Sequence, residues 1–329
     1  MGHPFDKESF HLRQGCFSVV WGNLVFQEMH GVIITSFKLL FFKEEKRMYV
    51  KSTGRTIFTG VFPEEFAPFV IMIVCDPLNF TRDPAEVISE EMLKEPKRVG
   101  ESPMMGVYNG IYKGVPVSIV STGTGGPARE LAMADLIHKE AKTHTVIDIG
   151  SSGTYQDFVK VGDLVISLGD VRTEGTTQEY IDPAYPALAH YEVVMGLIEA
   201  ADRLGYPYHV GVTRSDDSIY MGSGVPLRDY LPPHRVEEGK KWKQAGVLNV
   251  QREIAQNFIM CNLFGLRGGS VRRVGRNFLT GEHMPEYPYS LEMTYRTALD
   301  AVVLLSQWDI KKQRAGRKWL TPSLFQKEN

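Results

Sequence analysis

The sequence predicts an α/β fold: a single domain in which helices flank a twisted central mixed sheet. From about residue 57 to residue 308, short apolar runs of strand length alternate with segments of helical periodicity. Two glycine-rich segments, STGTGGPA (121–128) and IDIGSSGT (147–154), are each predicted to form a turn directly after one of these runs. Because ligands of α/β sheets bind beyond the carboxyl ends of the strands, we expect a binding site where the two segments meet.

The predicted strands are apolar runs rich in β-branched residues, and the predicted helices are the amphipathic segments between them. The strands span residues 69–74, 115–120, 145–150, 163–168, 208–213 and 268–274. The helices span residues 84–95, 128–142, 192–204, 249–265 and 290–308.

The first glycine-rich segment leads from a predicted strand into a predicted helix. Pro127 stands in the first turn of that helix, where the missing N–H of proline is tolerated. The N–H groups of such a turn converge on one point, which suits phosphate or a sugar oxygen. A plain strand-to-helix loop is the alternative interpretation. The predicted substrate contacts are Thr122, Gly123, Thr124 and Gly125.

Composition and charge exclude several classes of function. The 329 residues include 37 basic and 39 acidic side chains, a net charge of −2, so we expect neither nucleic acid nor membrane as a partner. The three cysteines lie far apart, which excludes a disulfide framework or a thiolate zinc site and predicts a cytoplasmic protein. The nine histidines form no metal-binding motif, so no metal or cofactor is expected.

The two ends of the chain differ from the domain, predicted at residues 57–308. Residues 1–56 form an N-terminal extension whose structure the sequence leaves open. Charged residues such as Glu28 and Lys38 interrupt its apolar runs below the about 18 residues that a membrane span needs. Residues 309–329 form a basic C-terminal tail for which we expect frayed structure.

Five segments, in order and spacing, resemble a known family. They are STGTGGPARE, IDIGSSGTYQDFVKVGDLVIS, GDVRTEGTTQEYIDPAYPA, GVTRSDDSIYMG and AGVLNVQREIAQNFIMCNLFGLRGG. The chain is similar to the nucleoside phosphorylase superfamily, which includes uridine phosphorylases and bacterial purine nucleoside phosphorylases. The resemblance implies a single α/β domain that assembles as a homo-oligomer, such as a dimer or hexamer. It also implies cleavage of the N-glycosidic bond of a small-molecule nucleoside, usually with inorganic phosphate as co-substrate.

Two matches within the resemblance carry the expected chemistry. Glu253, in NVQREIA, matches the family's glutamate that grips the ribose hydroxyl groups, and it is the predicted catalytic residue. Ser151 matches a position that meets phosphate and ribose, while Ser152 and Gly153 match positions beside the base. The alternatives are a solvated glutamate on a helix face and serines that only close a turn.

The family's phosphate-binding residues are replaced. Cys75 and Asn79 stand where the family has a glycine and an arginine. Pro103 and Asp148 stand at the positions of two further arginines. Each lost charge-assisted hydrogen bond weakens anion binding by about 1.5–3 kcal/mol, and Asp148 would repel a nearby phosphate. The residues predicted at the anion site instead are Asp76, Arg82 and Arg98.

The base pocket departs from the family as well. Ser223 and Val225 fall where uridine phosphorylases read uracil with glutamine and arginine, and Ile219 falls at the stacking aromatic position. Asn277 lies in the region where purine-type members have an acidic aspartate, and an amide cannot act as a general acid. Tyr220 and Asn277 are nevertheless predicted to contact substrate.

Several arginines lie close to these motifs. Arg252 replaces the usual methionine before Glu253, which suggests contact with a phosphate or carboxylate, although an exposed helix arginine is the alternative. Arg272, Arg273 and Arg276 form a cluster that serves the same end or is a solvated strand edge.

Two classes of function therefore remain open. The first is an enzyme: a pentosyltransferase of the nucleoside phosphorylase type, resembling uridine phosphorylase with an altered phosphate site, or a nucleosidase-type hydrolase. The second is a non-catalytic homologue that binds a nucleoside or nucleotide. Glu253 and the glycine-rich segments favour the enzyme, and the missing arginines favour the binding protein.

Overall fold

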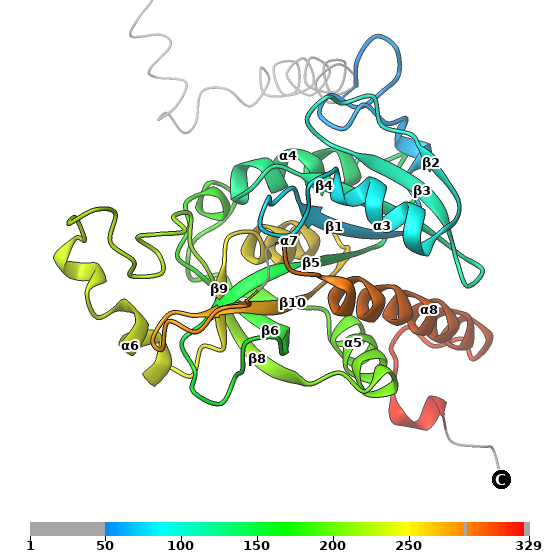
Figure 1. Ribbon diagram of the computed structural model, residues 1–329. Helices are drawn as coiled ribbons and strands as arrows, with labels where there is room; N and C mark the ends of the chain where they lie inside the picture. The colour runs from blue at the N-terminus through cyan, green and yellow to red at the C-terminus, as the bar shows by residue number, and fades with distance from the viewer. Residues whose placement is uncertain (1–49, 286–287, 326–329) are drawn as a thin grey trace, which may run out of the picture. The chain divides into compact units, whose positions relative to one another are not determined.

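A ten-stranded sheet organises the residues that the structure, a computed structural model, describes: 50–285 and 288–325 (Figure 1). The strand order is β10-β6-β8-β9-β5-β1-β4-β3-β2, with β7 paired to β6. β5 also pairs directly with β10, so five strands close into a ring. The strands are β1 (Phe69–Val74), β2 (Lys94–Arg98), β3 (Val107–Tyr112), β4 (Val115–Thr122), β5 (Thr145–Thr154), β6 (Leu164–Arg172), β7 (Ala187–Leu188), β8 (Tyr208–Ser215), β9 (Asn249–Gln251) and β10 (Arg267–Asn277).

Helices cover both faces of this sheet, and the predicted α/β fold is confirmed. α3, α5 and α8 pack on one face, whereas α4 and α7 pack on the other (Figure 1). The α-helices of the described residues are α3 (Pro84–Met92), α4 (Gly126–Leu136), α5 (Tyr191–Leu204), α6 (Glu238–Gln244), α7 (Ile254–Leu263) and α8 (Glu292–Arg314). From Thr53 onward the chain forms one compact unit.

The strand β1 shows why the central runs are apolar at every position. Phe69, Ile71 and Ile73 join the core under α3, α5 and α8. Val70 and Met72 point the other way and join the core under α4 and α7. A strand covered on both faces has no solvent side, so its sequence reads as a continuous apolar run rather than an alternation.

The second glycine-rich segment differs from the turn that the sequence predicts. β5 continues through it to Thr154, because residues 145–154 pair in parallel with β10 and Gly153 pairs with Val250 of β9. Glycine is required at 153, where an added Cβ would lie 1.9 Å from the Phe278 ring. The segment is therefore a strand on which an aromatic ring rests.

Two predicted helices begin or end elsewhere. The helix predicted from residue 249 begins at Ile254, because Asn249–Gln251 forms β9 between β5 and β8. The helix predicted to reach residue 95 ends at Met92, and residues 94–98 pair with β3. Pro96 explains the second change, since proline cannot continue a helix.

The beginning of the predicted basic tail is ordered in the structure. α8 continues past Trp308 to Arg314, and Lys312 donates to the buried carboxylate of Glu192 at 2.7 and 2.6 Å. Leu320 is also buried. An ion pair and an apolar anchor therefore hold residues that composition alone marks as solvated.

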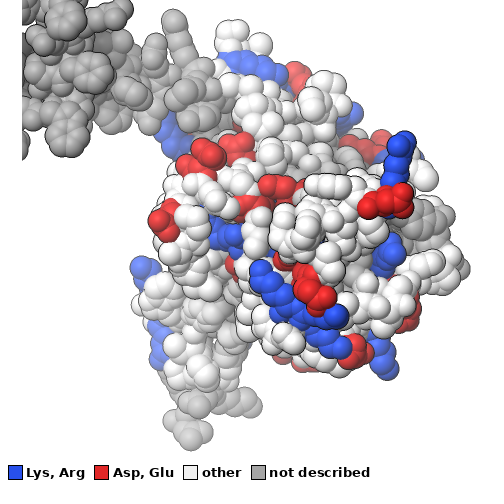
Figure 2. Space-filling view, turned by 90° about the vertical axis from the view of Figure 1, so that its left-hand side faces the viewer, with Lys and Arg blue, Asp and Glu red and all other residues white. Residues whose placement is uncertain are grey.

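The surface of the described residues carries both signs of charge. On the face in Figure 2, lysine and arginine side chains lie among aspartate and glutamate side chains. Within residues 50–285 and 288–325, no helix is long and apolar enough to cross a membrane. The apolar runs in residues 16–42 lie outside the described residues.

Candidate active site

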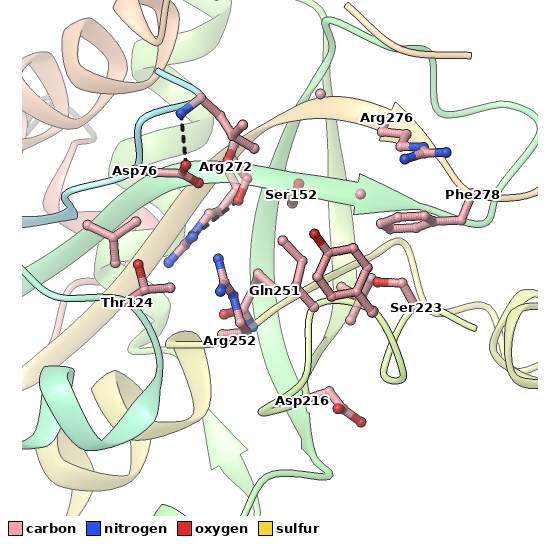
Figure 3. A pocket seen from close by; sticks show the side chains of 18 of the residues that line it. Asp76, Thr124, Ser152, Asp216, Ser223, Gln251, Arg252, Arg272, Arg276 and Phe278 are labelled. Carbon is pink, nitrogen blue, oxygen red and sulfur yellow. Dashed lines mark hydrogen bonds between the residues drawn. The ribbon is translucent and has the colours of Figure 1, made fainter. Parts of the chain in front are cut away.

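A cavity of about 550 Å³ lies where several strands of the sheet end (Figure 3). Its walls include Val74 of β1, Ser151 of β5, Gln251 of β9 and Arg272 of β10. We call one side the glutamate end, defined by Thr124, Ser151, Arg252, Glu253 and Arg272. We call the other side the aromatic end, defined by Tyr220, Ser223, Arg276 and Phe278.

The first glycine-rich segment contributes to the glutamate end through its backbone. Gly125 has a φ of +90°, which glycine adopts readily, and its N–H donates to Glu253 Oε1 at 2.8 Å. Thr124 lines the cavity, whereas Thr122 is buried and donates to the carbonyl of Gly123. Of this segment, Thr124 thus reaches the cavity directly, and Gly125 acts through Glu253.

Glu253 stands at the N-terminus of α7, with its side chain only 1% exposed. Arg272 Nη2 donates to its Oε2 at 3.1 Å, and Arg252 Nε lies 4.0 Å from Oε1. Burial by itself would raise the pKa of Glu253, but the charges of Arg272, Arg252 and Arg129 outweigh it and lower the pKa below its usual value. The carboxylate is therefore held in its ionised form.

Asp148 does not face the cavity, which differs from the repulsion of phosphate expected from the sequence. Its side chain is completely buried and accepts hydrogen bonds from Arg129, Arg272 and Ser270 at 2.8–3.1 Å. The parallel register of β5 and β10 places Ser270 beside Asp148 and Arg272 beside Gly150. Its negative charge is neutralised inside the protein.

The residues of the second glycine-rich segment have separate surroundings. Ser152 accepts a hydrogen bond from Asn249 at 2.9 Å and its hydroxyl lies 3.4 Å from the carbonyl of Arg273. Ser151, Ser152 and Gly153 all line the cavity. Since Ser152 is held by Asn249, the hydroxyl of Ser151 is the better placed of the two to meet a ligand.

Three further arginines near the cavity, besides Arg272, differ in what they contact. Arg252 lines the glutamate end, with its side chain 21% exposed. Arg276 lies at the aromatic end, over the Phe278 ring at 5.7 Å (Figure 3). Arg273 points elsewhere and donates to the carbonyls of Gly162 and Ser290. Arg252 and Arg276 are the guanidinium groups with room for a ligand.

Of Tyr220 and Asn277, both predicted to contact substrate, Tyr220 lines the cavity and Asn277 does not. Ile219, Tyr220, Ser223 and Val225 line the cavity. The amide of Asn277 is occupied within the protein: it donates to the carbonyl of Gln156 at 3.1 Å and accepts from the N–H groups of Leu279 and Thr280. Because its side chain closes the turn after β10, Asn277 does not line the cavity.

The residues predicted at the anion site fall mainly in a neighbouring hollow of about 390 Å³. Asp76 lines both spaces, whereas Arg82 and Arg98 line only this hollow. Arg82 pairs with Glu86 and Glu90, both at 3.0 Å. Arg98 donates to the carbonyls of residues 100 and 102. Neither guanidinium reaches the glutamate end.

Sequence reasoning missed Gln251 and Phe278. The side-chain oxygen of Gln251 accepts the N–H of Ile254 at 2.8 Å, and its amide donates to Asp170 at 3.0 Å. Burial raises the pKa of Asp170 to about 7. Gln251 stands two residues before Glu253, so the same strand end carries both. Phe278 follows the arginine-rich strand, and no motif marked it.

The described residues contain no group of three or more histidine, cysteine, aspartate or glutamate side chains placed to hold a metal ion. Among the groups that line the cavity are the ionised carboxylate of Glu253, the accessible guanidinium groups of Arg252 and Arg276, hydroxyl groups and aromatic faces, together with Asp76, Asp216 and His283. This set suits a sugar hydroxyl pair, an anion and a flat ring.

The fold and the cavity thus define an α/β protein with a cavity at the carboxyl ends of its strands, where α/β sheets bind their ligands. The chain belongs to the phosphorylase superfamily, whose family model matches residues 80–294. The resemblance drawn from the five segments is confirmed.

Relatives of known name share this part of the chain. A uridine phosphorylase of Thermococcus kodakarensis is 39% identical over 218 residues, which cover 66% of this chain and 77% of the relative. A uridine phosphorylase of Haemophilus influenzae is 31% identical over 207 residues, covering 60% of this chain and 78% of the relative. A guanosine phosphorylase of Halorubrum lacusprofundi is 29% identical over 208 residues, covering 60% and 80%.

Proposed function

We propose that the protein is a pentosyltransferase that cleaves the N-glycosidic bond of a nucleoside with inorganic phosphate. The observation that carries the proposal is Glu253, an ionised carboxylate at the cavity held by Gly125 and Arg272. Membership of the phosphorylase superfamily supports the same reaction class. The names of the relatives cover both a pyrimidine and a purine nucleoside, so the base stays open.

Glu253 binds the sugar in this proposal. A carboxylate has about four lone-pair positions, and the described protein donors occupy one on each oxygen. The remaining positions accept hydrogen bonds from two ribose hydroxyl groups. As the bond from C1′ to the base breaks, positive charge develops on the sugar, and a fixed negative charge nearby stabilises it.

The phosphate lies against Thr124, Ser151 and Arg252 in this proposal. Thr124 and Arg252 lie at the glutamate end beside Arg272 (Figure 3), and the carbonyl of Ser151 accepts from Arg272 there. Arg252 supplies the charge that the family's arginines provide elsewhere. A phosphate oxygen attacks C1′ and forms the new C–O bond, while the electron pair of the broken bond leaves with the base. The base lies at the aromatic end, against Tyr220 and Phe278.

Hydrolysis is the second candidate, and the placement of two arginines favours it. Arg82 and Arg98 lie in the neighbouring hollow with their own partners, so the glutamate end has fewer cations for phosphate than the sequence suggested. Asn79 donates to the carbonyl of Tyr289 and does not replace the missing arginine. Water would then attack C1′ in place of phosphate.

The test is to incubate the purified protein with uridine, thymidine, inosine, adenosine and methylthioadenosine, each with and without phosphate. Release of free base that requires phosphate supports the proposal. Release without phosphate supports hydrolysis. No turnover, together with saturable stabilisation by a nucleoside, contradicts both and indicates a binding protein.

Assembly and location are part of the same proposal. The superfamily supports a homo-oligomer, a dimer or hexamer, which light scattering on the purified protein tests. Cytoplasmic location stays a prediction from the scattered cysteines.

A further inference from the structure

We propose that Asp148 is a positioning residue that keeps Glu253 open to its ligand by occupying most of the guanidinium of Arg272. Asp148 acts through Arg272 and touches no ligand itself. The part of this inference that concerns sugar binding rests on the proposed function, whereas the part that concerns the pose of Arg272 does not.

The geometry is a buried row of alternating charges. Arg129 Nη2 donates to Asp148 Oδ1 at 2.8 Å, Arg272 Nε donates to Asp148 Oδ2 at 2.8 Å, and Arg272 Nη2 also donates to Glu253 at 3.1 Å. All four side chains are at most 2% exposed. Two guanidinium groups and two carboxylates balance, so the row is neutral as a whole.

The hydrogens of Arg272 are shared unequally between the two carboxylates. Its Nε donates to Asp148 at 2.8 Å and its Nη2 to the same carboxylate at 2.9 Å, which is a bidentate pair. Nη1 donates to the carbonyl of Ser151 at 3.1 Å. What reaches Glu253 is a single contact from Nη2. A two-point pair fixes the guanidinium plane, and a one-point contact leaves the second carboxylate partly free.

Without Asp148, the preferred partner of Arg272 would be Glu253. A guanidinium and a carboxylate pair most favourably through two parallel hydrogen bonds, especially away from water. Such a pair would take up lone pairs on both oxygens of Glu253, one of which already accepts from Gly125. The sugar hydroxyl groups would then compete with Arg272. Asp148 prevents this by holding Arg272 from the other side.

Arg129 makes the arrangement possible by balancing the charge of Asp148. Without Arg129, the carboxylates of Asp148 and Glu253 would share the single guanidinium of Arg272. One buried negative charge would then be uncompensated, which is costly away from water. A variant that removes Asp148 without unbalancing the buried charge must therefore change Arg129 as well. R129M together with D148N removes one charge of each sign and leaves Arg272 facing Glu253 alone.

The experiment compares D148N with the wild-type protein in two readouts. A crystal structure of D148N is expected to show Arg272 in a bidentate pair with Glu253. In kinetics with whichever of uridine or inosine the wild type cleaves, KM is expected to rise by about tenfold or more, which is the loss of one to two hydrogen bonds. The acid limb of kcat/KM is expected to move to lower pH, since Glu253 gains a closer cation and loses a nearby anion.

The matched control is S270A. Ser270 donates to Asp148 at 3.1 Å on the same side of the strand pair but does not contact Arg272. This variant is expected to keep KM within about twofold of wild type. An equal rise of KM in S270A would overturn the proposal, because general loosening between β5 and β10 would explain both.

If D148N does not fold, the charge-balanced variant R129M/D148N and the variant R272K test the proposal instead. The double variant is expected to give the same bidentate pair and rise of KM, whereas R272K is expected to raise KM less, because an ammonium lacks the planar fork that forms a bidentate pair with Glu253. An unchanged pose of Arg272 and an unchanged KM overturn the proposal. If none of the five nucleosides of the activity test is cleaved, the proposed function fails, and the pose of Arg272 in the variant structures still decides this inference.

Discussion

Two clusters of charged side chains have the same balance of charge and different surroundings. The inner cluster consists of Arg129, Asp148, Arg272 and Glu253. The outer cluster consists of Glu192, Arg267, Asp309 and Lys312, with contacts of 2.6–3.1 Å. Each contains two cations and two carboxylates. In the inner cluster every side chain is at most 2% exposed, whereas Asp309 of the outer cluster is 32% exposed.

The difference between them is what their carboxylates face. In the outer cluster, Glu192 of α5 accepts from Lys312 of α8, from Arg267 of β10 and from the N–H of Leu320, so its lone pairs are used inside the protein. In the inner cluster, Glu253 borders the cavity and has lone pairs to spare. A saturated cluster fastens elements together, and an unsaturated one beside a cavity is available for chemistry.

The largest expected effect is the loss of activity in Glu253→Ala. Removing the carboxylate that is proposed to hold the sugar and to face the developing charge should lower kcat/KM by about 10²–10³-fold. The secondary structure seen by circular dichroism should stay unchanged. Unchanged kcat/KM in this variant would end the assignment of Glu253.

The matching change in the outer cluster, Glu192→Ala, should lower stability and leave activity unchanged. Kinetics should stay near wild type, while the free energy of unfolding falls by roughly 2–4 kcal/mol, because Lys312 and Arg267 lose a buried partner. Urea denaturation measures this loss. Glu199→Ala is the control on the same helix, since Glu199 is exposed and forms a surface pair with Arg203; its effect should stay within about 0.5 kcal/mol.

A smaller effect is expected from Arg252→Met at the glutamate end. Loss of this guanidinium should raise KM for phosphate by about tenfold with little change in stability. The control is Arg276→Met, which removes a guanidinium from the aromatic end and should leave KM for phosphate unchanged. Equal effects of the two variants would show that the two ends do not divide the substrates as proposed.

A further prediction concerns the pH dependence of stability. Burial raises the pKa of Asp170 from 3.8 to about 7 in the folded protein. Folding therefore favours its protonated form, so its contribution to stability is fully present below pH 3.8 and is lost as the pH rises towards 7. Asp170→Asn should remove this part of the pH dependence of the free energy of unfolding, as measured by urea denaturation at pH 4 and pH 8. The same change at exposed Asp157 should leave the slope as it is.

The core of the fold could be predicted because each of its runs carries its own pattern. Residues 69–74 are apolar at every position and form β1 at those bounds, since both faces are covered. The strand β2 could not be predicted: its sequence is KEPKR, all of it exposed, and its pairing with β3 alone makes it a strand. The short strand β9 was likewise absorbed into the predicted helix that follows it.

The candidate site was predicted in part. Glu253, Ser151, Thr124 and Arg252 stand together at one end of the cavity. Asn277 is used to close a turn, and Arg82 and Arg98 lie in the next hollow. Their roles depend on which neighbours reach them first, and a linear pattern does not contain that information. These site assignments stay predictions until the variants are measured.

By itself, the sequence determined the α/β class, its central strands and the family, because hydrophobic periodicity and ordered motifs are local properties of the chain. Only the tertiary structure decided what Asp148 does. Its partner Arg272 lies 124 residues away and meets it through the parallel register of β5 and β10. Coulomb attraction depends on distance in space and on burial, so a residue that reads as a repulsive charge in the sequence becomes the fixed anchor of an arginine in the fold.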